Sequence, residues 1–92
     1  MVTKKRESYF VYILLCDNGS YYTGYSTNPA SRLIKHMKGQ GARYTRMHKP
    51  SSIVYLQSLK TRRAAMKRER QIKALTHTEK SHLIEGRSSK GP

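Results

Sequence analysis

The sequence predicts an α/β protein of the α+β type, in which a small three-stranded antiparallel sheet is flanked by helices in the order β-β-α-β-α-α. Three observations lead to this prediction. The apolar and aromatic run Tyr9–Cys16 is too short for a buried helix and is rich in strand-forming residues. Residues 17–19, Asp-Asn-Gly, follow it directly and predict a hairpin. Later segments begin with side chains that cap helices.

The first strand and residues 20–25, the returning strand, can pair in two registers. A two-residue turn would place Tyr12 opposite Tyr25 and Tyr22 on the other face of the sheet. A three-residue turn, with Gly19 in the left-handed conformation, would place Tyr12 opposite Gly24. Tyr22 would then share a face with Tyr12, because a shift of one residue moves every side chain to the other face. In that register we expect Gly24 to leave open space above the Tyr12 ring for a phosphate or a water.

A helix should follow the hairpin. Asn28 can cap it, Pro29 fits its first position, and Gly39 suits its C-terminal end. Residues 39–51 contain two glycines and a proline, so they predict a loop, with one short helical turn around residues 42–46.

The third strand and two further helices complete the predicted fold. Residues 53–56 are apolar and predict a strand. Thr61 can cap a helix over residues 62–75. Thr76 and Glu79 have the spacing of a capping box, which predicts a short last helix over residues 77–84.

The charge balance points to a polyanionic partner. The chain of 92 residues carries 19 basic and 5 acidic residues, a formal net charge of +14. Such a surface attracts phosphate backbones, so nucleic acid is the expected partner. A membrane is a weaker expectation, because no basic amphipathic helix has a large exposed aliphatic face.

The length allows one small domain. We expect a flexible basic N-terminus over residues 1–8, a folded domain over 9–85 and a disordered tail over 86–92. Cys16 is the single cysteine, which excludes an internal disulfide and leaves no spacing typical of a zinc site. No secretory or membrane-spanning segment is expected, so the predicted location is cytoplasmic.

Glu69 is the only carboxylate between Asp17 and Glu79, in a stretch with thirteen Lys and Arg residues. Its spacing from Ala65 and Ile72 places it on the apolar stripe of its helix rather than among the basic residues. An isolated acid in such a surface can hold a metal ion against a phosphate, or it can pair with Lys73 four residues later.

Two more polar residues share one side of the first helix. Arg32 and His36 are four residues apart and lie beside the apolar stripe of that helix.

The ordered set of Tyr12, then Tyr22, Thr23 and Gly24, then Arg32 and finally Glu69 resembles the GIY-YIG nuclease superfamily over about residues 9–84. The chain is most similar to the short stand-alone bacterial branch of that superfamily. It departs from the family pattern at the first triplet, which reads Phe-Val-Tyr without the glycine, and at the second, which reads Tyr-Thr-Gly.

The resemblance implies a metal-dependent endonuclease that hydrolyses phosphodiester bonds in DNA, in a setting such as repair or recombination. It implies that Glu69 is the one protein ligand of a single Mg²⁺ (or Mn²⁺) ion and that Arg32 stabilises charge on the phosphate. Tyr12 would help to deprotonate or orient the attacking water, which requires nearby cations to tune its pKa. Tyr22 would hold Tyr12 or a water in place, and His36 would either assist proton movement or contact a phosphate.

Other readings stay open. The tyrosines could serve only packing, and the chain could be a non-catalytic module that binds DNA or structured RNA, or a small RNA-associated protein. We expect a partner protein to supply targeting, since one small domain carries the whole fold. We expect basic residues and one aromatic residue to contact the backbone of the nucleic acid. They lie in the loop and in the second long helix: Arg43, Tyr44, Arg46, Lys49, Arg62 and Lys67.

Overall fold

The computed structural model describes residues 8–86 and confirms the predicted α+β class. Gly86, which we expected in the tail, is the C-cap of the last helix, and the rest of the predicted tail and all but Ser8 of the predicted N-terminal segment lie outside the described residues. The short turn predicted in the loop is a helix of its own. The elements in order are β1 (Tyr9–Cys16), β2 (Tyr21–Ser26), α1 (Pro29–Met37), α2 (Arg43–Met47), β3 (Pro50–Leu59), α3 (Arg62–Lys73) and α4 (His77–Glu85).

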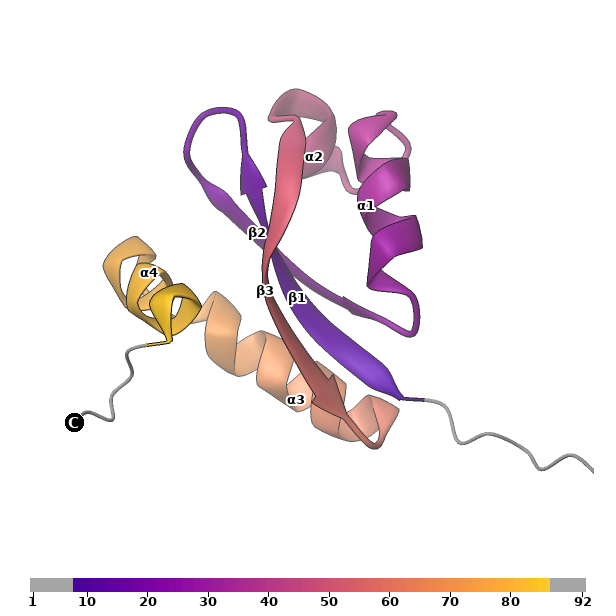
Figure 1. Cartoon of the computed structure of the whole chain (residues 1–92), viewed down its shortest axis with the longest axis vertical. Helices are drawn as coiled ribbons and strands as arrows, with labels where there is room; N and C mark the ends of the chain where they lie inside the picture. The colour runs from indigo at the N-terminus through magenta and orange to yellow at the C-terminus, as the bar shows by residue number, and fades with distance from the viewer. Residues whose placement is uncertain (1–7, 87–92) are drawn as a thin grey trace, which may run out of the picture.

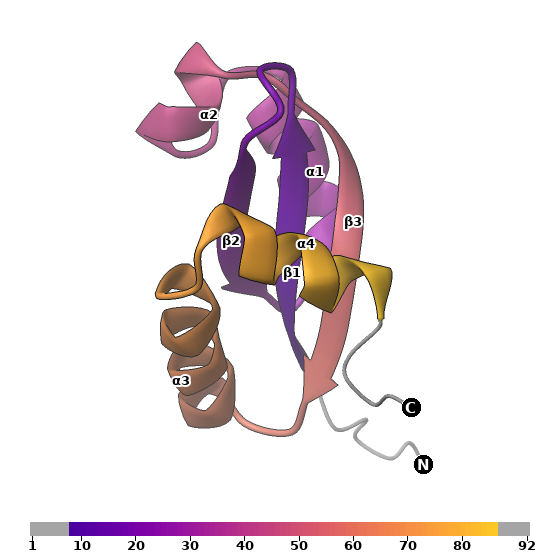
Figure 2. The ribbon, with the colours of Figure 1, turned by 90° about the vertical axis from the view of Figure 1, so that its left-hand side faces the viewer.

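The three strands form one antiparallel sheet in the order β2-β1-β3, so β1 is central. Helix α1 lies on one face of this sheet, while α3 and α4 lie on the other (Figures 1 and 2). Both faces of β1 are therefore covered, and Val11, Tyr12, Ile13 and Leu14 are buried in succession. A continuous apolar run, rather than an alternating one, is what such a strand requires.

The helices begin where the capping residues predict. The side chain of Asn28 accepts a hydrogen bond from the Ser31 amide, and Pro29 follows it as the first residue of α1. Thr61 caps α3 by accepting from the Ala64 amide. Thr76 and Glu79 form the complete capping box of α4, with both reciprocal hydrogen bonds present.

Strand β3 is longer than predicted. The sequence indicates a strand only over residues 53–56, whereas β3 spans Pro50–Leu59. The serines and glutamine that flank the apolar centre give no strand signal of their own, but the eight residues of β1 supply partners along nearly the whole length of β3. Pairing with a long central strand therefore overrides weak local propensity.

The apolar core lies between the sheet and α3. Val11 and Ile13 of β1 pack with Ala65 and Ile72 of α3, and Tyr9, Tyr21, Tyr25, Val54, Tyr55, Leu59, Leu83 and Ile84 surround them. Within residues 8–86, no helix is long and apolar enough to cross a membrane.

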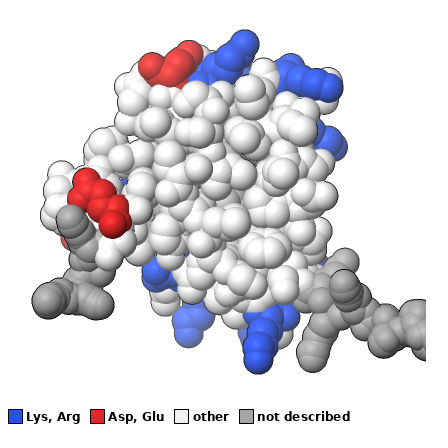
Figure 3. All heavy atoms as spheres, in the orientation of Figure 1, with Lys and Arg blue, Asp and Glu red and all other residues white. Residues whose placement is uncertain are grey.

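The charge is distributed unevenly over the surface. Strand β3 contains no charged residue along its ten positions. The side of the molecule shown in Figure 3 is correspondingly almost free of charge, with Lys and Arg gathered at its edges.

Candidate active site

The hairpin brings Tyr12 and Tyr22 to the same face of the sheet. Tyr12 lies opposite Gly24 and Leu14 lies opposite Tyr22. The turn contains three residues, with Gly19 in the left-handed conformation at φ 83°. Of the two registers that the sequence left open, the structure therefore has the second.

Gly24 does not leave the open space that we expected. A Cβ atom at residue 24 would lie 2.6 Å from the Tyr12 hydroxyl oxygen and 2.8 Å from Cζ. The Tyr12 ring itself fills the space over the glycine and is only 1% exposed. The expectation that a phosphate or water enters there is wrong, because Gly24 serves instead to let the phenol lie flat against the backbone of β2.

Helix α1 adds Arg32 and His36 to the same side of the sheet. The His36 ring is buried, with its centroid 5.1 Å from that of Tyr22 and 6.5 Å from that of Tyr12. Arg32, one turn earlier, is exposed, and its guanidinium interacts with the Tyr12 hydroxyl. The spacing of four residues thus presents one buried ring and one accessible cation to the two phenols.

Glu69 reaches the phenols from the other layer of the fold. Helix α3 packs against β1 and β2, and β2 is an edge strand of the sheet. The Glu69 side chain is 19% exposed and lies 3.5 Å from the Lys73 ammonium. Its negative charge raises the pKa of both Tyr12 and Tyr22, so the carboxylate is close enough to act on both phenols.

The pKa of each site tyrosine is above its ordinary value. Burial is the main cause for Tyr12, and Arg32 lowers that pKa without overcoming the effect of burial. Burial also raises the pKa of Tyr22, followed by the charge of Glu69. Arg32 alone therefore does not provide the tuning that a tyrosine base requires, and both phenols stay protonated at neutral pH.

The carboxylate of Glu69 suits a hard divalent cation. Over residues 8–86 there is no group of three or more His, Cys, Asp or Glu side chains that could enclose a metal. One partly exposed carboxylate beside a basic surface fits Mg²⁺, which keeps most of its water and binds through one or two carboxylates and substrate phosphates. The ion pair with Lys73 competes with metal binding, because it also uses the Glu69 carboxylate.

The residues expected to contact a nucleic acid lie on two separate elements. Arg43 and Arg46 of α2 are exposed, as are Lys49 after it and Arg62 and Lys67 of α3. Tyr44, the remaining one, is also exposed, at 38%, and has contacts within the protein. Its hydroxyl donates to Ser20 Oγ at 2.6 Å, and its ring packs against Tyr22 and His48.

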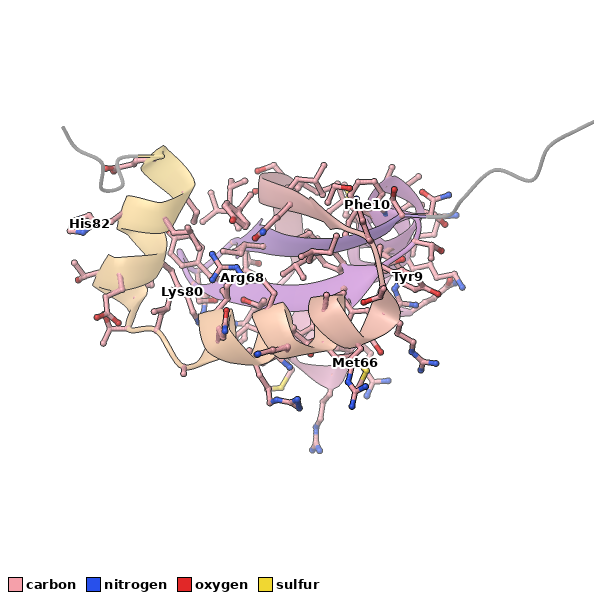
Figure 4. All side chains as sticks on the ribbon, turned by 90° about the horizontal axis from the view of Figure 1, so that it is seen from below. Tyr9, Phe10, Met66, Arg68, Lys80 and His82 are labelled. Carbon is pink, nitrogen blue, oxygen red and sulfur yellow. The ribbon has the colours of Figure 1, made fainter. Side chains whose placement is uncertain are left out.

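The basic run of α3 is not uniformly exposed to solvent. Figure 4 shows Arg68 on the sheet side of α3 and Met66 on the outer side. Arg68 donates to Gln57 of β3 at 2.9 Å, which makes it a structural residue. On the outer side, a wide shallow cavity of about 540 Å³ is lined by Arg62, Arg63, Met66 and Arg70.

Several contacts between segments far apart in the sequence could not be found from the sequence. His77 stacks on Tyr21 with a centroid distance of 4.5 Å and approaches the Gly19 carbonyl at 3.0 Å. Thr45 contacts the buried ring of His36. None of these pairs shows a periodic spacing, because each joins elements that only the tertiary fold brings together.

Comparison with known proteins agrees with this geometry. The GIY-YIG catalytic domain family matches residues 8–82. A UPF0213 protein of Staphylococcus aureus is 44% identical over 81 residues, which are 88% of this chain and 99% of the relative. The solution structure of a UPF0213 protein from Bacillus halodurans is 36% identical, covers 90% of this chain and 88% of its own, and superposes with a TM-score of 0.56. A solution structure of an E. faecalis protein is 35% identical, with a TM-score of 0.58 over 100% of this chain and 97% of its own.

These matches extend over nearly the whole folded part of the chain and include short proteins of almost the same length. The fold is the one that the sequence resemblance implied. The chain therefore belongs to the GIY-YIG catalytic domain family, whose nucleases act on nucleic acid, and its relatives are short UPF0213 proteins.

Proposed function

We propose that this protein is a metal-dependent endonuclease that hydrolyses phosphodiester bonds in DNA. The observation that carries the proposal is the approach of Arg32, His36 and Glu69, from two helices on opposite faces of the sheet, to the phenols of one hairpin. A packing role for the tyrosines alone would not require a cation, an imidazole and the isolated acid of a basic surface in the same place. DNA repair or recombination is a suitable setting for such an activity, and a partner protein would supply targeting.

Each residue has a role that its position supports. Glu69 would hold one Mg²⁺ or Mn²⁺ ion, which polarises the phosphate and neutralises the leaving oxygen when it is bound. Arg32 is exposed and fixed on α1, so its guanidinium can bind the phosphate and stabilise charge that develops there. Tyr12 would orient the attacking water, and Tyr22 would hold Tyr12 or that water in position.

The exposed basic residues of α2 and α3 would bind the substrate backbone. Arg43, Arg46 and Lys49 lie at one end of the fold, and Arg62 and Lys67 lie on α3. Contacts of this kind position a duplex without reading its sequence. They weaken as the salt concentration rises, because the counterions that binding releases from the nucleic acid then contribute less free energy.

A non-catalytic nucleic-acid-binding module is the second candidate. The ion pair between Glu69 and Lys73 favours it, because a carboxylate committed to a lysine does not bind a metal. The two candidates predict different behaviour when Glu69 loses its charge.

The deciding experiment compares Glu69→Gln with Glu85→Gln, which makes the same change of charge at the end of α4. The protein is incubated with supercoiled plasmid, and in parallel with a structured RNA, with Mg²⁺ or Mn²⁺ present. We expect the wild type and Glu85→Gln to nick the plasmid and Glu69→Gln to lose at least about 10²-fold in rate. Binding without nicking by the wild type would support the module, and cleavage confined to RNA would replace DNA as the substrate.

A further inference from the structure

The two ring nitrogens of His36 have different environments. Nδ1 lies 2.7 Å from the Thr45 hydroxyl oxygen, a contact between α1 and α2 that is fully buried. Nε2 is also buried and has no hydrogen-bond partner among the described residues 8–86. A buried polar atom without a partner costs about 1–3 kcal/mol, so its presence in a fold needs a reason.

The direction of the buried hydrogen bond follows from counting protons. The Thr45 hydroxyl has one hydrogen, which it donates to the Ala42 carbonyl at 2.9 Å. A carbonyl oxygen can only accept, so this assignment cannot be reversed. With that donation in place the Thr45 oxygen accepts from His36 and both hydrogen bonds are made, whereas a hydroxyl that donated to Nδ1 would make only one of the two. The pairing of the two groups therefore favours a proton on Nδ1. In the neutral ring, Nε2 is therefore a bare lone pair.

The absence of a side chain at Gly41 lets the loop backbone approach the His36 ring closely. A Cβ atom there would lie 2.6 Å from His36 Cε1 and 2.7 Å from Cγ, so the backbone of the loop lies directly against the imidazole. The rings of Tyr12 and Tyr22 stand nearby as aromatic neighbours. The imidazole is thus held between the hairpin, the loop and α2.

We propose that Thr45 is a positioning residue of the site, which fixes His36 as the Nδ1-protonated tautomer and so keeps Nε2 available as a proton acceptor. Burial and the charge of Arg32 lower the pKa of His36, which keeps the ring neutral and agrees with this assignment. Of the two roles that the sequence left open for His36, the geometry favours proton movement, because a bare lone pair cannot donate to a phosphate.

The proposed reaction needs a group that accepts a proton, and Nε2 can be that group. This part of the inference rests on the proposed function. Burial raises the pKa of Tyr12 and Tyr22, so neither phenol gives up its proton readily. The proton that Tyr12 or a water bound at the site releases can pass to Nε2, where an N–H bond forms as the O–H bond breaks. The tautomer itself, by contrast, is independent of whether the protein cleaves anything.

The first measurement is the ring ¹⁵N spectrum of His36 at neutral pH, without nucleic acid or metal. We expect wild type and Thr45→Ser, which keeps the hydroxyl, to show a protonated Nδ1 and a bare Nε2. Thr45→Val keeps the shape but removes the acceptor, so its ring should shift toward protonation at Nε2. Thr45→Ala makes the same test if the valine variant does not fold. A wild-type ring protonated at Nε2, or a tautomer unchanged by the loss of the hydroxyl, would overturn the proposal.

The second measurement is plasmid nicking by the same variants. Loss of a partner that fixes a histidine tautomer typically costs 10–100-fold, so we expect about that loss in kcat for Thr45→Val, little change in KM, and recovery in Thr45→Ser. Unchanged nicking by a valine variant whose tautomer has shifted would refute the use of Nε2 while leaving the Glu69 result intact. If the wild type nicks no substrate, the proposed function fails and the spectrum alone decides the tautomer.

Discussion

Arg32 combines exposure with contact to a buried phenol. Because its side chain is exposed, Arg32→Ala should change the free energy of unfolding by no more than about 0.5 kcal/mol. Its guanidinium nevertheless interacts with the Tyr12 hydroxyl. We therefore expect the variant to lose about 10²–10³-fold in cleavage rate. Lys35→Ala, an exposed residue of the same helix, is the control. A rate within a factor of two of wild type would contradict a role for Arg32 at the phosphate.

Replacing threonine by valine should change the free energy of unfolding in opposite directions at two positions. Within the part of the chain that the structure describes, the Thr23 hydroxyl is buried without a hydrogen-bond partner, whereas the Thr61 hydroxyl caps α3. Thr23→Val should therefore raise the free energy of unfolding by about 1 kcal/mol, or the Tm by about 4–8 °C. Thr61→Val should lower it by about 0.5–2 kcal/mol. Thermal unfolding of both variants measures the pair, and destabilisation by Thr23→Val would mean that its hydroxyl has a partner in solution.

At the scale of elements, the packing of Tyr12 against β2 depends on Gly24. Its missing side chain is what allows Tyr12 to lie on β2, so Gly24→Ala must displace the phenol. We expect a cost of about 1–3 kcal/mol from overpacking, together with a loss of cleavage. Gly39→Ala serves as the control, because φ at that residue is 77° and no atom of the described residues 8–86 lies within 4 Å of the added Cβ. It should lose about 1 kcal/mol through backbone strain alone, and an active Gly24→Ala of equal stability would refute the packing role of Gly24.

The elements also show which features of the fold can be predicted from local sequence signals. Caps such as Asn28 and Thr76 act within one helical turn, so the helix starts could be predicted, and the turn residues reduced the hairpin to two registers. The full length of β3 and the burial of His36 could not be predicted. The first depends on pairing with β1, and the second depends on Gly41 and Thr45 folding over the ring. The order Tyr12, Tyr22, Arg32, Glu69 indicated the site, whereas the hydrogen bonds that orient its side chains required tertiary contacts.

At the scale of the whole molecule, the net charge of +14 acts against folding. Raising ionic strength from about 0.01 M to about 0.15 M shortens the Debye length from about 30 Å to about 8 Å and screens this repulsion. We therefore expect the Tm to rise over that range, and to rise further with phosphate at equal ionic strength if anions bind the basic surface. Calorimetry of the wild type checks this, and a Tm that falls with modest salt would contradict it.

The five residues of helix α2 include both exposed and buried side chains. Arg43 and Arg46 point to solvent, while Thr45 between them is buried against His36. A strand of nucleic acid bound by those arginines would stabilise the short helix, and with it the position of the Thr45 hydroxyl that contacts the imidazole. Substrate binding at the surface and alignment of the proton-accepting nitrogen inside would in this way be coupled through a single turn of backbone.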